Sequence, residues 1–250
     1  MKGNERHQLI TERLREDGYV EVAELAATTG ASEMTVRRDL DQMAALGLLR
    51  RVRGGAAAVH HAVAPFPDRL TEAGDAKSRI ADAVAKLLAD HDSVVLDSGT
   101  TCLKVARRLR ERPVTVMPMS LHAVTALADA PTARLLVPGG EPQPGELSLR
   151  GPLAVRSLRA LRFDAAVVSP SAFTVGDGLA TDNLADADIK QAMLAVAARV
   201  IVVADGSKWG RRGFAHVCPV DRVTVVVTDD RAPADQRDEL TARGVQVITC

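Results

Sequence analysis

A run of residue types typical of an anion-binding loop stands at Asp97-Ser98-Gly99-Thr100-Thr101. It follows the apolar run 94–96, which predicts a buried strand, and it opens a segment with helical periodicity that extends to Leu109. At such a turn a glycine lets the backbone approach a ligand, the free amides of the first helical turn point at it, and hydroxyls add donors. The alternative is that the Ser and Thr residues only cap the helix. The run is not a Walker loop, because no Gly-Lys-Ser/Thr follows.

A second loop with ligand-binding residue types is Asp205-Gly206-Ser207-Lys208-Trp209-Gly210, which follows the apolar run 200–204. If both runs are strands of one parallel sheet, Lys208 lies at the same sheet edge as the first loop. Lysine occurs only six times in this arginine-rich chain, so a lysine in a Gly-rich loop favours a compact charge for an anion. A solvated loop lysine is the alternative. Lys190, on a predicted helix over 185–198, is a further candidate to close the site.

Residues 32–55 combine a short helix pattern with two arginine clusters. Val36, Leu40 and Met43 have the i, i+4, i+7 spacing of one apolar helix stripe, which leaves Arg37 and Arg38 off that stripe. A helix with a buried stripe and a cationic outer face suits the major groove of DNA. A second cluster, Arg50-Arg51-Val52-Arg53, ends at a Gly-Gly turn and predicts a wing that lies along phosphates. The alternatives are a solvated helix face and an ordinary turn.

The elements before this stretch complete a helix-turn-helix. Residues 5–17 and 21–29 predict two helices, and Gly30 ends the second. Ser32 is a good cap for the third helix, because its hydroxyl can accept a hydrogen bond from a first-turn amide. We therefore predict a winged helix-turn-helix domain over residues 1–57.

The rest of the chain alternates predicted helices and continuous Val/Ile runs. This pattern predicts a largely parallel, Rossmann-like α/β sheet covered on both faces, over residues 77–250. Residues 170–184 are expected to be a long loop. Residues 58–76 are expected to be a linker, and its His60-His61 pair lacks further ligands at metal spacing.

Composition limits the classes of function. The 250 residues carry 32 basic and 32 acidic side chains, so DNA binding must come from local clusters. The three cysteines have neither metal spacing nor the pattern of a disulfide framework. No apolar run reaches membrane-spanning length, and the start is polar, so we expect a protein of the cytoplasm with no membrane contact.

The quoted residues resemble the DeoR family of bacterial transcriptional regulators. Arg6-x3-Ile10-x3-Leu14, the run 32–40 and the run 47–56 match its DNA-binding domain. The resemblance implies that the groove-facing and phosphate-facing residues are Ser32, Glu33, Thr35, Arg37, Arg38, Arg51 and Arg53. Asp39 is expected to orient an arginine, because a carboxylate that faced phosphates would be repelled.

The second half also resembles this family, in its effector-sensing domain, which is similar in fold to sugar-phosphate isomerases and CoA transferases. The matching segments include 96–101, 178–181 and 204–210. The resemblance implies a phosphorylated sugar effector that contacts Asp97, Ser98, Gly99, Thr100, Thr101, Gly139, Gly140, Lys190 and Lys208. Two departures, Pro118-Met119 and Ser169-Pro170-Ser171, stand at positions that would line this site, and they leave the effector's identity open.

We therefore expect a DNA-binding regulator, a repressor released by a phosphorylated sugar, that acts as a homo-oligomer on double-stranded DNA without a cofactor. A sugar-phosphate isomerase or deaminase is the rival class, with Asp97, Asp164 and Asp205 as possible acid/base groups. A regulator with a lost or altered effector response is the third reading.

Overall fold

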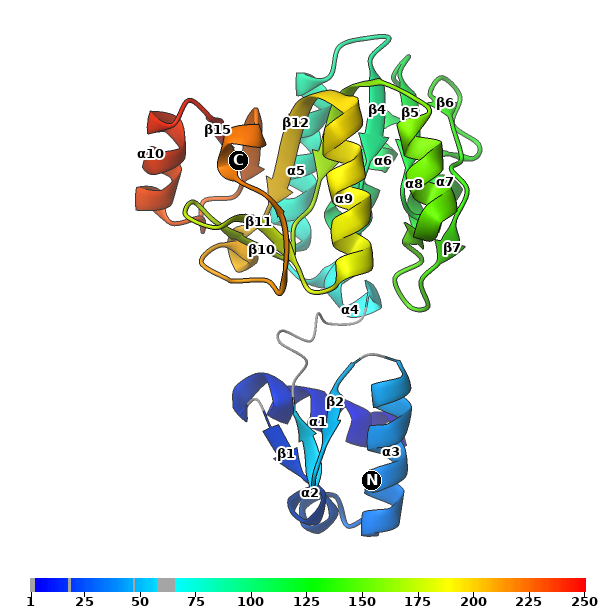
Figure 1. The fold of residues 1–250 in the computed structure, drawn as a ribbon, viewed down its shortest axis with the longest axis vertical. Coiled ribbons are helices and arrows are strands. Elements are labelled where there is room, and N and C mark those ends of the chain that lie inside the picture. The colour runs from blue at the N-terminus through cyan, green and yellow to red at the C-terminus, as the bar shows by residue number, and fades with distance from the viewer. Residues whose placement is uncertain (1–2, 18, 47, 58–65) are drawn as a thin grey trace. The chain divides into compact units, whose positions relative to one another are not determined.

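The computed structural model describes residues 3–17, 19–46, 48–57 and 66–250 (Figure 1). The chain divides into two compact units, residues 1–64 and 65–250. The His60-His61 pair and the first part of the expected linker lie outside the described residues. Within the described residues, no helix combines the length and apolarity needed to cross a bilayer.

Unit 1 is a winged helix-turn-helix, as the sequence predicts. Its elements are α1 (Gly3–Asp17), β1 (Tyr19–Glu21), α2 (Val22–Thr29), α3 (Glu33–Ala45), β2 (Arg50–Val52) and β3 (Gly55–Ala57). The predicted stripe of Val36, Leu40 and Met43 is buried in one apolar core with Ile10 and Leu14 of α1. Packing of this stripe on α1 stabilises a domain too small for its helices to persist alone.

The wing is a small antiparallel sheet in the order β1-β3-β2. Gly55 makes this pairing possible, because a Cβ atom at that position would meet the Val20 carbonyl oxygen at 2.0 Å. The backbone amide of Val22 also donates to the Gly54 carbonyl oxygen. The turn between β2 and β3 is thereby fixed to the start of α2.

Unit 2 is built on seven parallel strands in the order β15-β14-β12-β9-β4-β5-β6. These are β4 (Ser93–Leu96), β5 (Thr115–Pro118), β6 (Arg134–Leu135), β9 (Phe163–Val168), β12 (Ala197–Ala204), β14 (Val225–Thr228) and β15 (Gln246–Thr249). The chain adds β5 and β6 on one side of β4, then returns to place β9 on the other side. The topological switch point therefore lies between β4 and β9, where open α/β sheets bind ligands.

Helices cover both faces of this sheet (Figure 1). The helices of unit 2 are α4 (Phe66–Thr71), which lies at the end of the strands, and α5 (Gly74–Leu87), α6 (Thr100–Leu109), α7 (Leu121–Leu127), α8 (Gly151–Arg159), α9 (Leu184–Val196) and α10 (Ala234–Ala242), with short 3-10 turns at Gly206–Lys208 and Val220–Arg222. Alternate strand residues point to opposite cores: Val95 packs with α8 and α9, whereas Val94 packs with α5, α6 and α7. The predicted largely parallel α/β fold is confirmed.

Two expectations from the sequence are wrong. Residues 170–184 are not a plain loop, because they contain β10 (Ala172–Thr174) and β11 (Gly178–Thr181), which form a small sheet with β13 (Ala215–Cys218). Residues 66–76 are not linker, because they form α4 and the start of α5. Two further short strands, β7 (Glu141–Pro142) and β8 (Leu149–Arg150), pair in antiparallel fashion before α8.

Replacing Leu40 by Ala is expected to destabilise unit 1 by about 2–5 kcal/mol, because Leu40 is fully buried and its loss leaves a cavity. Leu46→Ala is the matched control: Leu46 is 65% exposed, so its effect stays within about 0.5 kcal/mol. Urea unfolding of the full chain followed by circular dichroism reports both units, while the fluorescence of the single tryptophan, Trp209, reports unit 2. A shift of the Trp209 transition, with no change in the remaining signal, would contradict the assignment of Leu40 to the core of unit 1.

Candidate functional site

The first turn of α3 is held by the predicted cap. The Ser32 hydroxyl accepts from the Thr35 amide at 3.2 Å and lies 2.9 Å from the Thr35 hydroxyl. The side chains of Ser32 and Thr35 are therefore hydrogen-bonded to each other within the first turn of α3. Their contact with DNA would require these hydroxyls to share or exchange hydrogen bonds.

The outer face of α3 carries two arginines, and they differ in whether another side chain pairs with them. Arg37 pairs with Glu33 one turn earlier at 3.0 Å, and both side chains are exposed. Glu33 thereby orients Arg37 and partly neutralises it. Arg38 is exposed and, within the described residues, has no hydrogen-bond or ion-pair partner. Arg38 is therefore the most available cation of this helix.

Asp39 faces inward, as expected from the repulsion between a carboxylate and phosphates. Its carboxylate accepts from Arg6 Nε at 2.7 Å and joins α1 to α3. Burial opposes the charge on Asp39, but Arg6 and His7 together outweigh it and lower the pKa of the carboxyl. The residue that Asp39 orients is Arg6, not one of its neighbours on α3.

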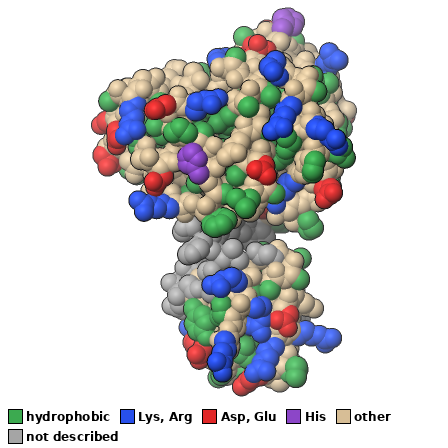
Figure 2. Space-filling model, in the orientation of Figure 1, with side chains coloured by type: hydrophobic (Ala, Val, Ile, Leu, Met, Phe, Trp, Pro, Cys, Tyr) green, Lys and Arg blue, Asp and Glu red, His purple; other side chains and the backbone are tan. Residues whose placement is uncertain are grey.

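The wing carries a second set of arginines. Arg51 is half-buried, pairs with Asp41 at 2.7 Å and donates to the Gly55 carbonyl oxygen, so it fixes the wing to α3. Arg50 and Arg53 are exposed and have no partner within the described residues. Figure 2 shows basic side chains spread over the visible face of unit 1, with acidic side chains between them. Of the two arginines predicted to contact phosphate, Arg53 is free to do so, because no described residue pairs with it, whereas Arg51 is held by Asp41 and by the Gly55 carbonyl oxygen.

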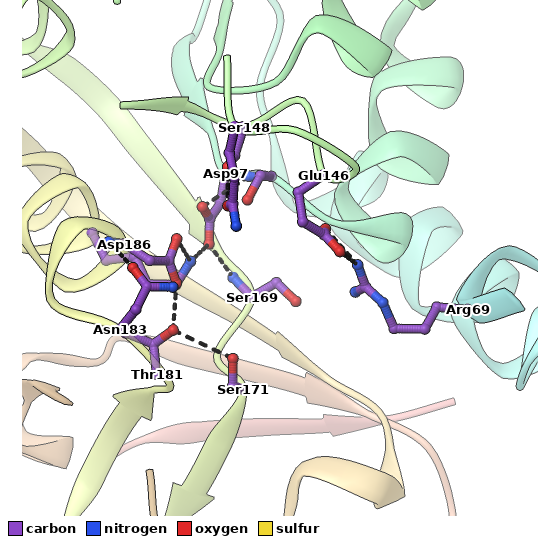
Figure 3. Close-up of polar contacts among 12 residues, drawn as sticks. Arg69, Asp97, Glu146, Ser148, Ser169, Ser171, Thr181, Asn183 and Asp186 are labelled. Carbon is purple, nitrogen blue, oxygen red and sulfur yellow. Dashed lines mark hydrogen bonds and ion pairs between the residues drawn. The ribbon is translucent and has the colours of Figure 1, made fainter. Parts of the chain in front are cut away.

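Asp97 is the centre of the polar network at the switch point (Figure 3). It follows β4, is 1% exposed, and accepts from Lys190 Nζ at 2.7 Å and from the Ser169 amide, after β9, at 2.9 Å. Its other oxygen accepts from the Ser98 amide at 2.8 Å. The turns after the two central strands and helix α9 therefore meet on one carboxylate.

Lys190 joins Asp97 to Asp186 one turn earlier on α9, at 3.1 Å. Thr181 donates to the second Asp186 oxygen, and Asn183 caps the helix by accepting from the Asp186 amide at 2.8 Å. Burial opposes the charge on Lys190, but the two carboxylates outweigh it and raise the pKa of the ammonium. The same ammonium lowers the pKa of Asp186, whereas burial raises the pKa of Asp97. Lys190 is therefore a buried counter-ion and not a free anion ligand.

Helix α6 begins at the switch point without a side-chain cap. Gly99 is the N-cap residue, with φ at +101°, and no side chain bonds to the first-turn amides. The side chains of Thr100 and Thr101 are buried and have no hydrogen-bond partner within the described residues. The capping alternative is therefore not what the structure shows, because the first-turn amides of α6 have no side-chain cap.

Lys208 lies at the end of β12, on the same sheet edge. Its ammonium has no hydrogen-bond partner within the described residues. Burial lowers the pKa of Lys208, and the nearby charge of Asp205 opposes that shift. β12 is two strands from β4, so the loops that follow them start about 10 Å apart. A small phosphorylated metabolite is long enough to reach both.

Gly139 and Gly140 contact α8 and not the Asp97 network. The Gly139 amide donates to the Ser157 hydroxyl at 3.1 Å. A Cβ atom at Gly140 would meet the Arg150 carbonyl oxygen at 2.8 Å and the Ala154 Cβ at 2.9 Å. Both glycines therefore allow the 139–142 segment to lie close to α8.

The two departures from the family pattern have different surroundings. Met119 is 1% exposed and packs in the apolar core. Ser169 does reach the site, through the amide that bonds to Asp97. Ser171 Oγ lies 3.3 Å from Thr181 Oγ1, so this turn supports the same network without a glycine.

Three charged residues at this edge were not singled out from the sequence. Lys77 donates to the carbonyl oxygens of Arg69 and Glu72 at 2.7 Å, and burial lowers its pKa. Arg69, on α4, pairs with Glu146 (Figure 3). Arg150 lies at the start of α8. Their signal was weak, since each is an isolated charge in a chain rich in arginine.

The acid/base groups of the rival enzymatic reading are engaged elsewhere. Asp164 accepts from the Ser93 amide and hydroxyl, near the opposite end of the strands, and these bonds lower its pKa. Asp205 accepts from the Ser207 amide at 2.9 Å. Within the described residues, no cluster of His, Cys, Asp and Glu could hold a metal ion.

Two family profiles match the chain. One, described as a DeoR-like helix-turn-helix domain, matches residues 6–62, and the other, described as a DeoR C terminal sensor domain, matches residues 72–230. The chain belongs to the DeoR family of transcriptional regulators. The expected family is thereby confirmed.

Relatives within this family are similar over nearly the whole chain. The putative aga operon transcriptional repressor of Escherichia coli O157:H7 is 32% identical, over 98% of this chain and 93% of that protein. The glycerol-3-phosphate regulon repressor of Escherichia coli K12 is 28% identical over 100% of both chains. Ribose 5-phosphate isomerase A of Methanocaldococcus jannaschii aligns over 55% of each chain, with 18% identity and a TM-score of 0.42, a similarity that carries no argument about function.

Replacing Lys190 by Met is expected to destabilise unit 2 by about 3–5 kcal/mol, because it leaves two buried carboxylates without their shared cation. Without the ammonium, the folded-state pKa of both carboxyls rises above the unfolded value near 4. Such groups favour the folded state at low pH and lose that contribution as the pH rises. The difference from wild type should therefore be smaller at pH 5 than at pH 8 in urea unfolding followed by Trp209 fluorescence.

Lys86→Met is the control, since Lys86 is exposed and should change stability little at either pH. A Lys190 variant whose instability did not depend on pH would show that the two carboxylates are not ionised partners of this lysine.

Proposed function

We propose that this DeoR-family regulator is a repressor that binds operator DNA through α3 and the wing and is released by a phosphorylated sugar or a related metabolite. The DNA half of the proposal is supported by the exposed Arg38 on α3 and by Arg50 and Arg53 on the wing, none of which has a partner among the described residues. The effector half is supported by one observation above all: the uncapped start of α6 at the switch point, on the same sheet edge as Lys208, which no described residue pairs. The names of the relatives, repressors of the aga and glycerol-3-phosphate regulons, agree with both halves.

In this proposal α3 lies in the major groove, where the fork of Arg38 is suited to the two acceptors of a guanine edge. Arg50 and Arg53 contact phosphates, which adds affinity but no sequence preference. One short reading helix covers only a half-site, so the active form is a homo-oligomer, at least a dimer, on a repeated operator. The partners are therefore double-stranded DNA, a second copy of the chain and the effector. We place the protein in the cytoplasm, where it would meet both ligands.

The effector's phosphate would occupy the uncapped amides of α6, and Lys208 would neutralise part of its charge. A ligand shifts an equilibrium only through unequal affinity for two states. The effector would therefore have to bind most tightly to the arrangement of units that fits the operator poorly. The chain enters unit 2 at α4, and Lys77 donates to the carbonyl oxygens of Arg69 in α4 and of Glu72 just after it. This connection gives a route by which the sheet edge could influence unit 1.

An isomerase or deaminase activity is the alternative, and we do not favour it. Asp97 is bound to Lys190 and to two amides, and the other candidate carboxylates have structural partners. Turnover of aldose phosphates to ketose phosphates by the purified protein would reverse this judgement.

Replacing Arg38 by Ala is expected to weaken binding to the operator by about 1–3 kcal/mol and to relax the preference for one base pair. Arg53→Ala should instead weaken binding to all sequences alike and reduce the salt slope by about one. Fluorescence anisotropy at several salt concentrations, with operator and scrambled duplexes, measures both effects. Equal losses for Arg38→Ala on both duplexes would show that Arg38 contacts phosphate only.

Replacing Lys208 by Met is expected to leave DNA affinity unchanged and to abolish effector-induced release, because the variant lacks the unpaired cation of the site. The measurement is a titration of the DNA complex with phosphorylated sugars at fixed salt, with Lys86→Met as the control. If the Lys208 variant is released from DNA at the same effector concentration as the wild type, Lys208 is not part of the effector site.

A further inference from the structure

Within the described residues, Arg150 has a charged group without a partner. Arg150 is the last residue of β8 and the N-cap residue of α8, and within the described residues its guanidinium makes no hydrogen bond or ion pair. Its Nε atom is buried and unsatisfied. Burial lowers the pKa of Arg150, while the nearby charges of Asp186, Glu146 and Asp97 oppose that shift. Three carboxylates are therefore near enough to act on the charge of Arg150, and within the described residues none of them bonds to it.

A second unsatisfied group lies on the neighbouring segment. Ser120 is 2% exposed and follows β5 at the same sheet edge, and its buried hydroxyl has no hydrogen-bond partner in the part of the chain that the structure describes. Its backbone forms an isolated bridge with Ser148, two residues before Arg150. Buried polar atoms without partners are rare in folded proteins, and two of them on adjoining segments indicate a place where water or a polar ligand completes the hydrogen bonds.

The charges around Arg150 restrict what that ligand can be. Asp97 and Asp186 share the single ammonium of Lys190, which leaves one negative charge. The positive charge of Arg150 balances this remaining negative charge. Glu146 does not change the sum, because it is already paired with Arg69. If a carboxylate of the effector also bound Arg150, the buried groups together with that carboxylate would carry a net negative charge. A hydroxyl group would add no charge, and it accepts from the guanidinium and donates to a carboxylate or to the Ser120 oxygen.

We propose that Arg150 is a specificity-determining residue that donates hydrogen bonds to hydroxyl groups of the effector, and that the effector is a phosphorylated neutral sugar or polyol, not a phosphorylated sugar acid. This inference rests on the proposed effector site. It adds which chemical groups the effector carries at the end remote from its phosphate. The phosphate occupies the α6 and Lys208 end, and the hydroxyl groups lie toward Arg150. The carboxylates nearby repel an acid at that position.

The test uses matched pairs of ligands that differ only in a terminal alcohol or carboxylate. Suitable pairs are glycerol 3-phosphate with 3-phosphoglycerate, erythritol 4-phosphate with 4-phosphoerythronate, and glucitol 6-phosphate with 6-phosphogluconate. Isothermal titration of the full chain should show the alcohol bound about tenfold or more tightly in the pair of suitable length. An acid bound as tightly as its alcohol, or more tightly, overturns the inference without any variant.

Arg150→Gln should weaken binding of the preferred alcohol by about 10- to 100-fold, the loss expected for a hydrogen bond from a charged donor. Arg156→Gln, an exposed arginine on the same helix, is the control and should bind as wild type does. An Arg150 variant that is folded by Trp209 fluorescence and binds with wild-type affinity overturns the role of Arg150. If none of the phosphorylated compounds binds the wild type, the proposed function fails; if they bind without preference, only this inference fails.

Discussion

The burial of Lys190 between Asp97 and Asp186 is the interaction on which the architecture of unit 2 depends. Such a group costs a large desolvation free energy, and it is tolerated only where every charge has a partner with good geometry. Here the partners come from the end of β4 and from α9, while the turn after β9 adds an amide. The network therefore holds together elements that are more than ninety residues apart in sequence. It fixes the switch point so that the amides at the start of α6 stay uncapped.

Unit 1 uses the same principle on a smaller scale. The Arg6–Asp39 pair connects α1 to α3, and the apolar stripe of α3 packs beneath it. A carboxylate in the middle of a reading helix would oppose DNA if it faced outward. Because Asp39 points inward, its carboxylate avoids the phosphates of DNA and pairs with Arg6 of α1. The remaining charges of the helix then divide between Arg37, which Glu33 restrains, and Arg38, which no described residue restrains.

Local patterns in the sequence predicted most of the framework, and the errors have physical causes. Continuous Val/Ile runs indicated the central strands, because a strand buried on both faces has few polar positions. β10 and β11 were missed because they are three and four residues long and stand among Ser, Pro and Gly residues typical of loops. α4 was missed because Phe66-Pro67 resembles a linker, although proline is compatible with a first helical turn. Lys190 was predicted to be near the site, but its role as a counter-ion depends on two carboxylates that only the fold brings to it. Arg150 could not be distinguished from other arginines, because what marks it is the absence of a partner.

The order of the strands has a consequence for the timing of synthesis. β4 and β9 are neighbours in the centre of the sheet, but the ribosome makes β5 and β6 between them. Until β9 emerges, one long edge of β4, with its buried Val94–Leu96 side chains, has no permanent partner. The helix-turn-helix unit is complete long before that moment, since its contacts are local and domains fold from the N-terminus as they appear. A nascent chain of this regulator therefore carries a complete helix-turn-helix unit while the sheet of unit 2 still exposes an apolar, unpaired side of β4.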